Sequence, residues 1–361
     1  MSFKPHFRLR LQCSDAPLQV PIAIGFANLS QTLPSAARRL TRCYVPSFVV
    51  AILISFLSTT NIYANQSTIE LIPADAEAGF NFPYVLRSPE SPKNKDKKTL
   101  LLVETNNSGN DDDYQRQIEA AIYFAANKGI GPVAAQKLDV PLLVPVFPRT
   151  ESEAHVYTHA LDRDTLTSAD KSLTRIDHQL LNMISDAQRR LKQKGISTRE
   201  RAVLVGFSAS GTFANRVAML HPQRVLAVVS GGINAFPMLP VSEYDGKTLN
   251  YPLGVADISD FVLGDFDLAT WREIPQLIFM GHKDDNDAVA YDDAYSPADR
   301  ETIHAAIGNE MDERWRTAQK IYLDSGSNST FITYGRIGHW TDTRVANDIA
   351  NFILYQTWDG T

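Results

Sequence analysis

The chain has 361 residues, of which 44% are hydrophobic and 21% are charged. With 19 glycines, 19 prolines and two cysteines, its composition excludes a disordered chain, a collagen-like fibre and a small disulfide-stabilised scaffold. The formal net charge is −6 and no block of basic residues offsets it, so we expect no nucleic-acid partner.

The N-terminal part of the chain has the pattern of a secretory signal. Three arginines between positions 38 and 42 precede an unbroken apolar run over residues 48–57, far shorter than the roughly 20 residues that cross a bilayer. An apolar core of about 7–15 residues after a basic stretch is typical of a signal peptide. We predict that residues 1–64 form an N-terminal extension cleaved after Ala64. The protein would then be exported, to the periplasm or outside the cell, without a stable membrane span.

Cleavage at this point would remove both cysteines, Cys13 and Cys43. Residues 65–361 would then contain no disulfide, no thiolate nucleophile and no cysteine-bound metal. A chain of this length can build a large apolar core without such cross-links. We therefore predict one catalytic domain over residues 65–361.

Short apolar runs alternate with amphipathic helical stretches along this domain. The runs predicted as strands are residues 99–104, 140–147, 201–207, 225–229, 276–280 and 330–334. The stretches predicted as helices are residues 171–194, 209–220, 298–323 and 345–355. Continuous apolar strands that alternate with helices predict an α/β fold, with a mostly parallel central sheet and helices on both faces. The long connection over residues 231–275 is predicted to be a cap-like insertion.

One segment places a serine between a strand and a helix. The predicted strand 201–207 runs straight into GFSASG at residues 206–211, and a predicted helix follows at once. Such a sharp turn requires small neighbours and exposes the hydroxyl of Ser208 at the carboxyl end of the sheet. There the N-terminus of the following helix favours a developing negative charge. This pattern is that of a nucleophile elbow.

With this motif the sequence resembles the α/β-hydrolase-fold serine hydrolases, esterase and polyester-depolymerase-like members in particular, over most of residues 80–361. The usual motif is G-x-S-x-G, whereas Ser210 stands at its fifth position here. The resemblance implies the order nucleophile, acid, base. It points to Ser208 as the nucleophile and to His339, after the last predicted strand, as the base. The acid is Asp284, three residues after a glycine, or alternatively Asp287.

The same resemblance implies an oxyanion hole built from two backbone N–H groups. One is that of Ala209, directly after the nucleophile. The other comes from the loop after strand 99–104, where Asn106 and Asn107 stand at positions that carry His-Gly in many relatives. Either asparagine can supply the second donor.

These residues predict an exported serine hydrolase that cleaves carboxylic esters, small or polymeric, through an acyl-Ser208 intermediate. One alternative is a serine peptidase of the prolyl-oligopeptidase kind, and another is a non-catalytic binding protein of the same fold. The sequence has no phosphate-binding glycine loop, dinucleotide fingerprint or zinc-ligand spacing, so neither a metal nor a cofactor is predicted. His221 is predicted to be a helix C-cap, and residues 157–164 a hydrogen-bonded surface loop or a substrate contact.

Overall fold

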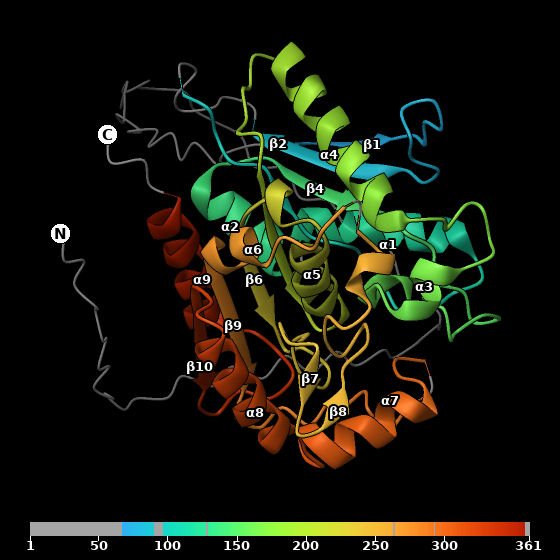
Figure 1. The fold of residues 1–361 in the computed structure, drawn as a ribbon. Helices are drawn as coiled ribbons and strands as arrows, with labels where there is room; N and C mark the ends of the chain where they lie inside the picture. Colours follow the sequence, from blue (N-terminus) through green and yellow to red (C-terminus); the bar gives the residue numbers. More distant parts are fainter. Residues whose placement is uncertain (1–66, 90–96, 128, 263, 292, 358–361) are drawn as a thin grey trace, which may run out of the picture. The chain divides into compact units, whose positions relative to one another are not determined.

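The computed structural model describes residues 67–89, 97–127, 129–262, 264–291 and 293–357 (Figure 1). The predicted signal peptide and its cleavage site at Ala64 lie outside the described residues. No helix in the described ranges is long and apolar enough to cross a membrane.

Eight strands form one central sheet. In spatial order they are β1 (Ser67–Ile72), β2 (Tyr84–Pro89), β4 (Leu142–Pro145), β3 (Leu102–Val103), β5 (Ala202–Phe207), β6 (Val225–Gly231), β9 (Gln276–Gly281) and β10 (Ser329–Tyr334). β2 runs antiparallel to both of its neighbours, and from β4 to β10 every pairing is parallel. The carboxyl ends of the parallel strands therefore meet at one edge of the sheet, where ligands of such sheets bind.

Helices cover both faces of this sheet, as predicted (Figure 1). Along β5, Ala202 and Leu204 belong to one apolar cluster, while Val203 and Val205 belong to a second, because successive side chains of a strand point to opposite faces. The first cluster includes residues of α4 (Ile176–Gln193), α5 (Ala209–Leu220) and α8 (Met311–Asp324). The second includes residues of α1 (Tyr114–Asn127), α2 (Ile130–Leu138) and α9 (Thr343–Gln356).

The prediction of a single helix over residues 298–323 is wrong. The structure has α7 (Pro297–Thr302) followed by a π-helical turn (Ile303–Ile307), and then α8 begins at Met311. Gly308 separates the two segments, with a φ of 147° that only glycine adopts readily. The apolar residues continue across this break, because both segments pack on the same core cluster.

The described residues of the segment 231–275 carry little regular structure, but many of their apolar side chains belong to the core. They contain the hairpin β7 (Glu243–Tyr244) and β8 (Lys247–Thr248) and the short helix α6 (Leu268–Glu273). Large side chains of this segment, among them Tyr251 and Trp271, are fully buried. Their burial explains why this connection is ordered, and its role as a cap stays a prediction.

Candidate active site

Ser208 lies at the junction of β5 and α5, in a strained backbone conformation. Its φ of 62° and ψ of −132° are unfavourable for a residue with a side chain, at a cost of about 1–3 kcal/mol. A Cβ atom at Gly206 would lie 2.1 Å from the carbonyl oxygen of Ser210, and one at Gly211 would lie 2.6 Å from that of Gly231. The close approach of these backbones is the physical reason for the small residues around Ser208.

Ser210 stands where the usual motif has glycine, and its side chain forms hydrogen bonds that stabilise the elbow. Its Oγ accepts the backbone N–H of Phe207 at 2.9 Å and donates to the carbonyl oxygen of Phe207 at 2.8 Å. The hydroxyl thus satisfies both backbone groups of the residue before Ser208. The departure from the usual motif adds hydrogen bonds within the turn.

His339 and Asp284 meet at the same edge of the sheet. The loops after β9 and β10 are tied together by backbone bonds from His282 to Tyr334 and from Lys283 to Ile337. Nδ1 of His339 lies 3.0 and 3.1 Å from the two carboxylate oxygens of Asp284. The Asp284 side chain is 1% exposed and that of His339 is 24% exposed, so the carboxylate is sheltered while the imidazole reaches the surface.

Asp287, the alternative acid, has a different partner. Its carboxylate forms an ion pair with Arg314, whose side chain is fully buried, and accepts the backbone N–H of Val289 at 3.0 Å. The structure therefore brings His339 together with Asp284 and engages Asp287 elsewhere.

Two asparagines lie between the serine and the histidine. Oγ of Ser208 donates to Oδ1 of Asn234 at 3.4 Å. Nδ2 of Asn286 donates to that same oxygen at 3.1 Å and lies 3.0 Å from Nε2 of His339. Neither asparagine is among the predicted site residues. Asn234 follows β6 and Asn286 follows β9, so a survey of polar residues after the parallel strands would have found them.

The predicted oxyanion-hole residues are Ala209, the first residue of α5, and Asn106 and Asn107, which lie in the loop after β3. The side chain of Asn106 exchanges two hydrogen bonds of 3.1 Å with the backbone of Phe147, and Nδ2 of Asn107 lies 3.5 Å from the carbonyl oxygen of Phe207. The backbone N–H groups of Ala209, Asn106 and Asn107 bond to no acceptor among the described residues. Their role in an oxyanion hole stays a prediction.

Two buried ionisable groups support the loop that carries Asn106. Oε2 of Glu104 accepts the backbone N–H of Gly131 at 2.5 Å, and burial raises the pKa of this carboxyl to about 8. Nε2 of His159 lies 3.0 Å from the carbonyl oxygen of Phe147, and burial lowers the pKa of this imidazole to about 4. The prediction of a surface loop over residues 157–164 is wrong, because residues 158–162 are buried and Thr158–Ala160 form a 3-10 helical turn.

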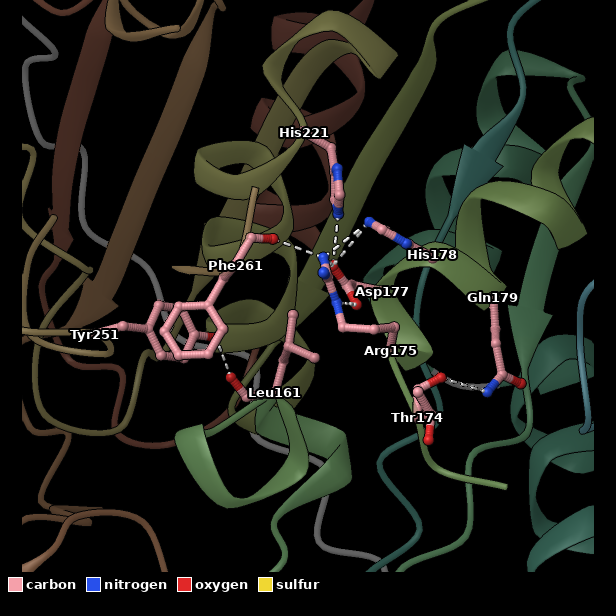
Figure 2. Close-up of polar contacts among 9 residues, drawn as sticks. All are labelled: Leu161, Thr174, Arg175, Asp177, His178, Gln179, His221, Tyr251 and Phe261. Atoms are coloured by element: carbon pink, nitrogen blue, oxygen red, sulfur yellow. Dashed lines mark hydrogen bonds and ion pairs between the residues drawn. The ribbon is translucent and has the colours of Figure 1, made fainter. Parts of the chain in front are cut away.

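One cluster offers atoms of the kind that bind metal ions. Ligand atoms of Asp177, His178 and His221 lie within 4.8 Å of one another. However, Figure 2 shows the guanidinium of Arg175 among them, and Nη2 lies 2.6 Å from Asp177, 2.8 Å from Nε2 of His178 and 2.7 Å from the carbonyl oxygen of Phe261. The positively charged guanidinium of Arg175 therefore takes the place that a metal ion would need. Its hydrogen bonds connect the start of α4 to the segment after β6.

His221 belongs to this cluster as the residue that ends α5. Its backbone N–H bonds to the carbonyl oxygen of Val217 at 2.8 Å, as expected of the predicted C-cap, and its Nε2 lies 2.7 Å from Asp177. The cluster therefore lies at the end of α5 opposite Ser208. A helix of this length separates the two sites by roughly 18 Å.

Solved structures that are similar to the chain include two hydrolases that act on polymers. A poly(aspartic acid) hydrolase from Sphingomonas sp. KT-1 has a TM-score of 0.52 and 15% identity, over 80% of this chain and 98% of that one. A poly(3-hydroxybutyrate) depolymerase from Bordetella parapertussis has a TM-score of 0.51 and 18% identity, over 82% and 91%. No protein-family model matches the sequence, and a search of curated proteins finds no match. The structural likeness shows that the chain has the α/β-hydrolase fold.

Proposed function

We propose that this protein is an exported serine hydrolase that cleaves carboxylic ester bonds. The observation that carries the proposal is the His339–Asp284 pair beside a serine held at a φ of 62°. A hydroxyl is a weak nucleophile at its ordinary pKa and needs a base that is oriented by a third group. The similar fold of two polymer-degrading hydrolases supports the hydrolytic reaction. The proposed substrate is a small or polymeric ester.

In the proposed reaction, Ser208 attacks the ester carbonyl and Nε2 of His339 takes the hydroxyl proton. Asp284 holds the imidazole through Nδ1 and stabilises the imidazolium without taking the proton itself. The N–H groups of Ala209 and of Asn106 or Asn107 stabilise the oxyanion, and one such donor is worth about 2.7–4 kcal/mol. His339 then protonates the departing alcohol, and water that His339 activates releases the acyl group from Ser208.

Labelling of the full chain with a fluorophosphonate, followed by peptide mapping, tests the nucleophile. The expected result is one adduct on Ser208 that is lost in Ser208→Ala and strongly slowed in His339→Ala. A folded protein with no adduct would overturn the proposal and favour the non-catalytic binding protein of the same fold.

Substrate pairs test the bond that is cleaved. A p-nitrophenyl ester and a p-nitroanilide with the same acyl group should differ by orders of magnitude in kcat/KM, in favour of the ester. A preference for the anilide would instead support the peptidase alternative. N-terminal sequencing of the protein recovered outside the cytoplasm tests the predicted cleavage after Ala64.

A further inference from the structure

The amide groups of Asn234 and Asn286 join the serine to the histidine in place of a direct contact. Asn234 accepts from Ser208 Oγ at 3.4 Å and from Asn286 Nδ2 at 3.1 Å, through the same oxygen. Asn286 Nδ2 is also 3.0 Å from Nε2 of His339. Among the described residues, no hydrogen bond joins Ser208 Oγ to His339.

The direction of these hydrogen bonds matters for the chemistry. Asp284 faces Nδ1 of His339, so Nδ1 carries the proton and Nε2 carries a lone pair. An amide Nδ2 is only a donor, so Asn286 must donate to that lone pair. The lone pair at Nε2 is the one that a general base uses to accept the serine proton. Asn286 therefore occupies the site that Ser208 needs.

The surroundings allow Asn286 to move while its neighbours stay in place. Asn286 is exposed, whereas Asp284 is buried against His339 and Asp287 is paired with Arg314. The backbone N–H of Asn286 bonds to Asp284 Oδ1 at 3.2 Å, which fixes the backbone and leaves the side chain able to rotate. A rotation of this kind would release Nε2 without disturbing the pair of His339 and Asp284.

We propose that Asn286 is a positioning residue. It occupies Nε2 of His339 in the free enzyme, is held there by Asn234, and gives way to the Ser208 hydroxyl when substrate binds. The inference rests on the proposed function, since it assigns Ser208 and His339 their roles. Before acylation, the hydrogen bond between Asn286 and Nε2 of His339 must break, so a variant without this bond should be acylated faster.

A fluorophosphonate of small size tests the inference, because its reaction needs the same proton transfer. The Ser208 Oγ–phosphorus bond forms, the phosphorus–fluorine bond breaks, and the serine proton passes to Nε2 of His339. Asn286→Ala should raise the maximal inactivation rate about two- to tenfold, the range that one net hydrogen bond represents, and leave the half-saturating probe concentration unchanged. Asn351→Ala, on the exposed side of α9, is the matched control and should change neither value.

A double-variant cycle separates positioning from a merely structural role. Asn234→Ala should also raise the maximal inactivation rate. The double variant Asn234→Ala/Asn286→Ala should label no faster than the faster of the two single variants, because both substitutions act on the same contact between Asn286 and His339. Asn286→Ser, which lacks the amide, serves if the alanine variant does not fold. A wild type that labels as fast as folded Asn286→Ala or Asn286→Ser would overturn this inference alone. Failure of every protein to label would overturn the proposed function as well.

Discussion

The hydroxyl of Ser210 bonds to both backbone polar groups of Phe207, at 2.9 Å to the nitrogen and 2.8 Å to the oxygen. This reciprocal pair joins residue 210 to residue 207 and so closes the turn that contains Ser208. A glycine at position 210 would fit the space and would supply neither bond. The residue that departs from the usual motif therefore contributes to the rigidity of the elbow.

Ser210→Ala should lower the free energy of unfolding by about 1–3 kcal/mol, because it removes the hydrogen-bond partner of the Phe207 backbone N–H at a partly buried site. We also expect slower fluorophosphonate labelling, since the hydrogen bonds of Ser210 help to hold Ser208 in its strained conformation. Urea unfolding and labelling kinetics measure the two effects. Ser242→Ala, at an exposed position, is the control. Unfolding of Ser210→Ala at the wild-type urea concentration would contradict the structural role of the hydroxyl.

We expect Asp284→Asn to lower activity and Asp287→Asn to lower stability. The first removes the partner of His339 Nδ1 and should lower kcat by about 10⁴-fold, because the imidazole loses its required tautomer. The second leaves buried Arg314 without its counter-charge, so it should lower the free energy of unfolding by about 1–3 kcal/mol with little change in kcat. Ester turnover and urea unfolding of both variants provide the measurement. If Asp287→Asn were the inactive variant, the acid would be Asp287.

Stability should fall as pH rises through the range set by Glu104. Burial raises its pKa to about 8 in the folded protein, above the unfolded value of about 4.3. The contribution of Glu104 to stability is therefore fully present below about pH 4.3 and is lost as pH rises through about 8. Glu104→Gln, which stays neutral, should gain stability relative to wild type from pH 5 to pH 9, measured by urea unfolding. The same change at exposed Glu301 should give no such trend.

The contribution of Asp177 to stability should have the opposite pH dependence. Its burial raises its pKa, but hydrogen bonds and charges from His221 and Arg175 outweigh that effect and hold the pKa below its ordinary value. The stabilisation is present above the unfolded pKa of about 3.9 and is lost as pH falls through the folded one. Asp177→Asn should lower the free energy of unfolding at pH 7 by about 3 kcal/mol, and the difference should shrink below pH 4.

The matched control for that prediction is Asp324→Asn, which removes an exposed ion pair with Lys320. Because solvent screens a pair of exposed charges, we expect a much smaller loss of stability in this control. Chemical unfolding at pH 7, 4 and 3 measures both variants. Equal losses for Asp177→Asn and Asp324→Asn at pH 7 would show that the cluster in Figure 2 does not stabilise the fold.

The sequence by itself determined the alternation of strands and helices and the position of the elbow. Predicted strand 201–207 and helix 209–220 agree closely with β5 and α5, because apolar periodicity and turn residues act over a few neighbouring positions. The order of the motifs along the chain likewise indicated the α/β-hydrolase fold. Several elements were not predicted, namely the antiparallel strands β1 and β2 and the helices α1 and α2. The predicted helix 298–323 includes Gly308, because the apolar residues on both sides of this glycine belong to one stripe.

The tertiary structure alone decided which groups meet at the carboxyl edge of the sheet. Asp284 and Asp287 are three positions apart and equally acidic, and only the fold shows that His339 contacts one while Arg314 contacts the other. Asn234 and Asn286 lie far apart in the sequence, yet both contact the candidate site, because parallel strands bring distant loops to one edge. Such contacts depend on long-range packing, which no local pattern encodes.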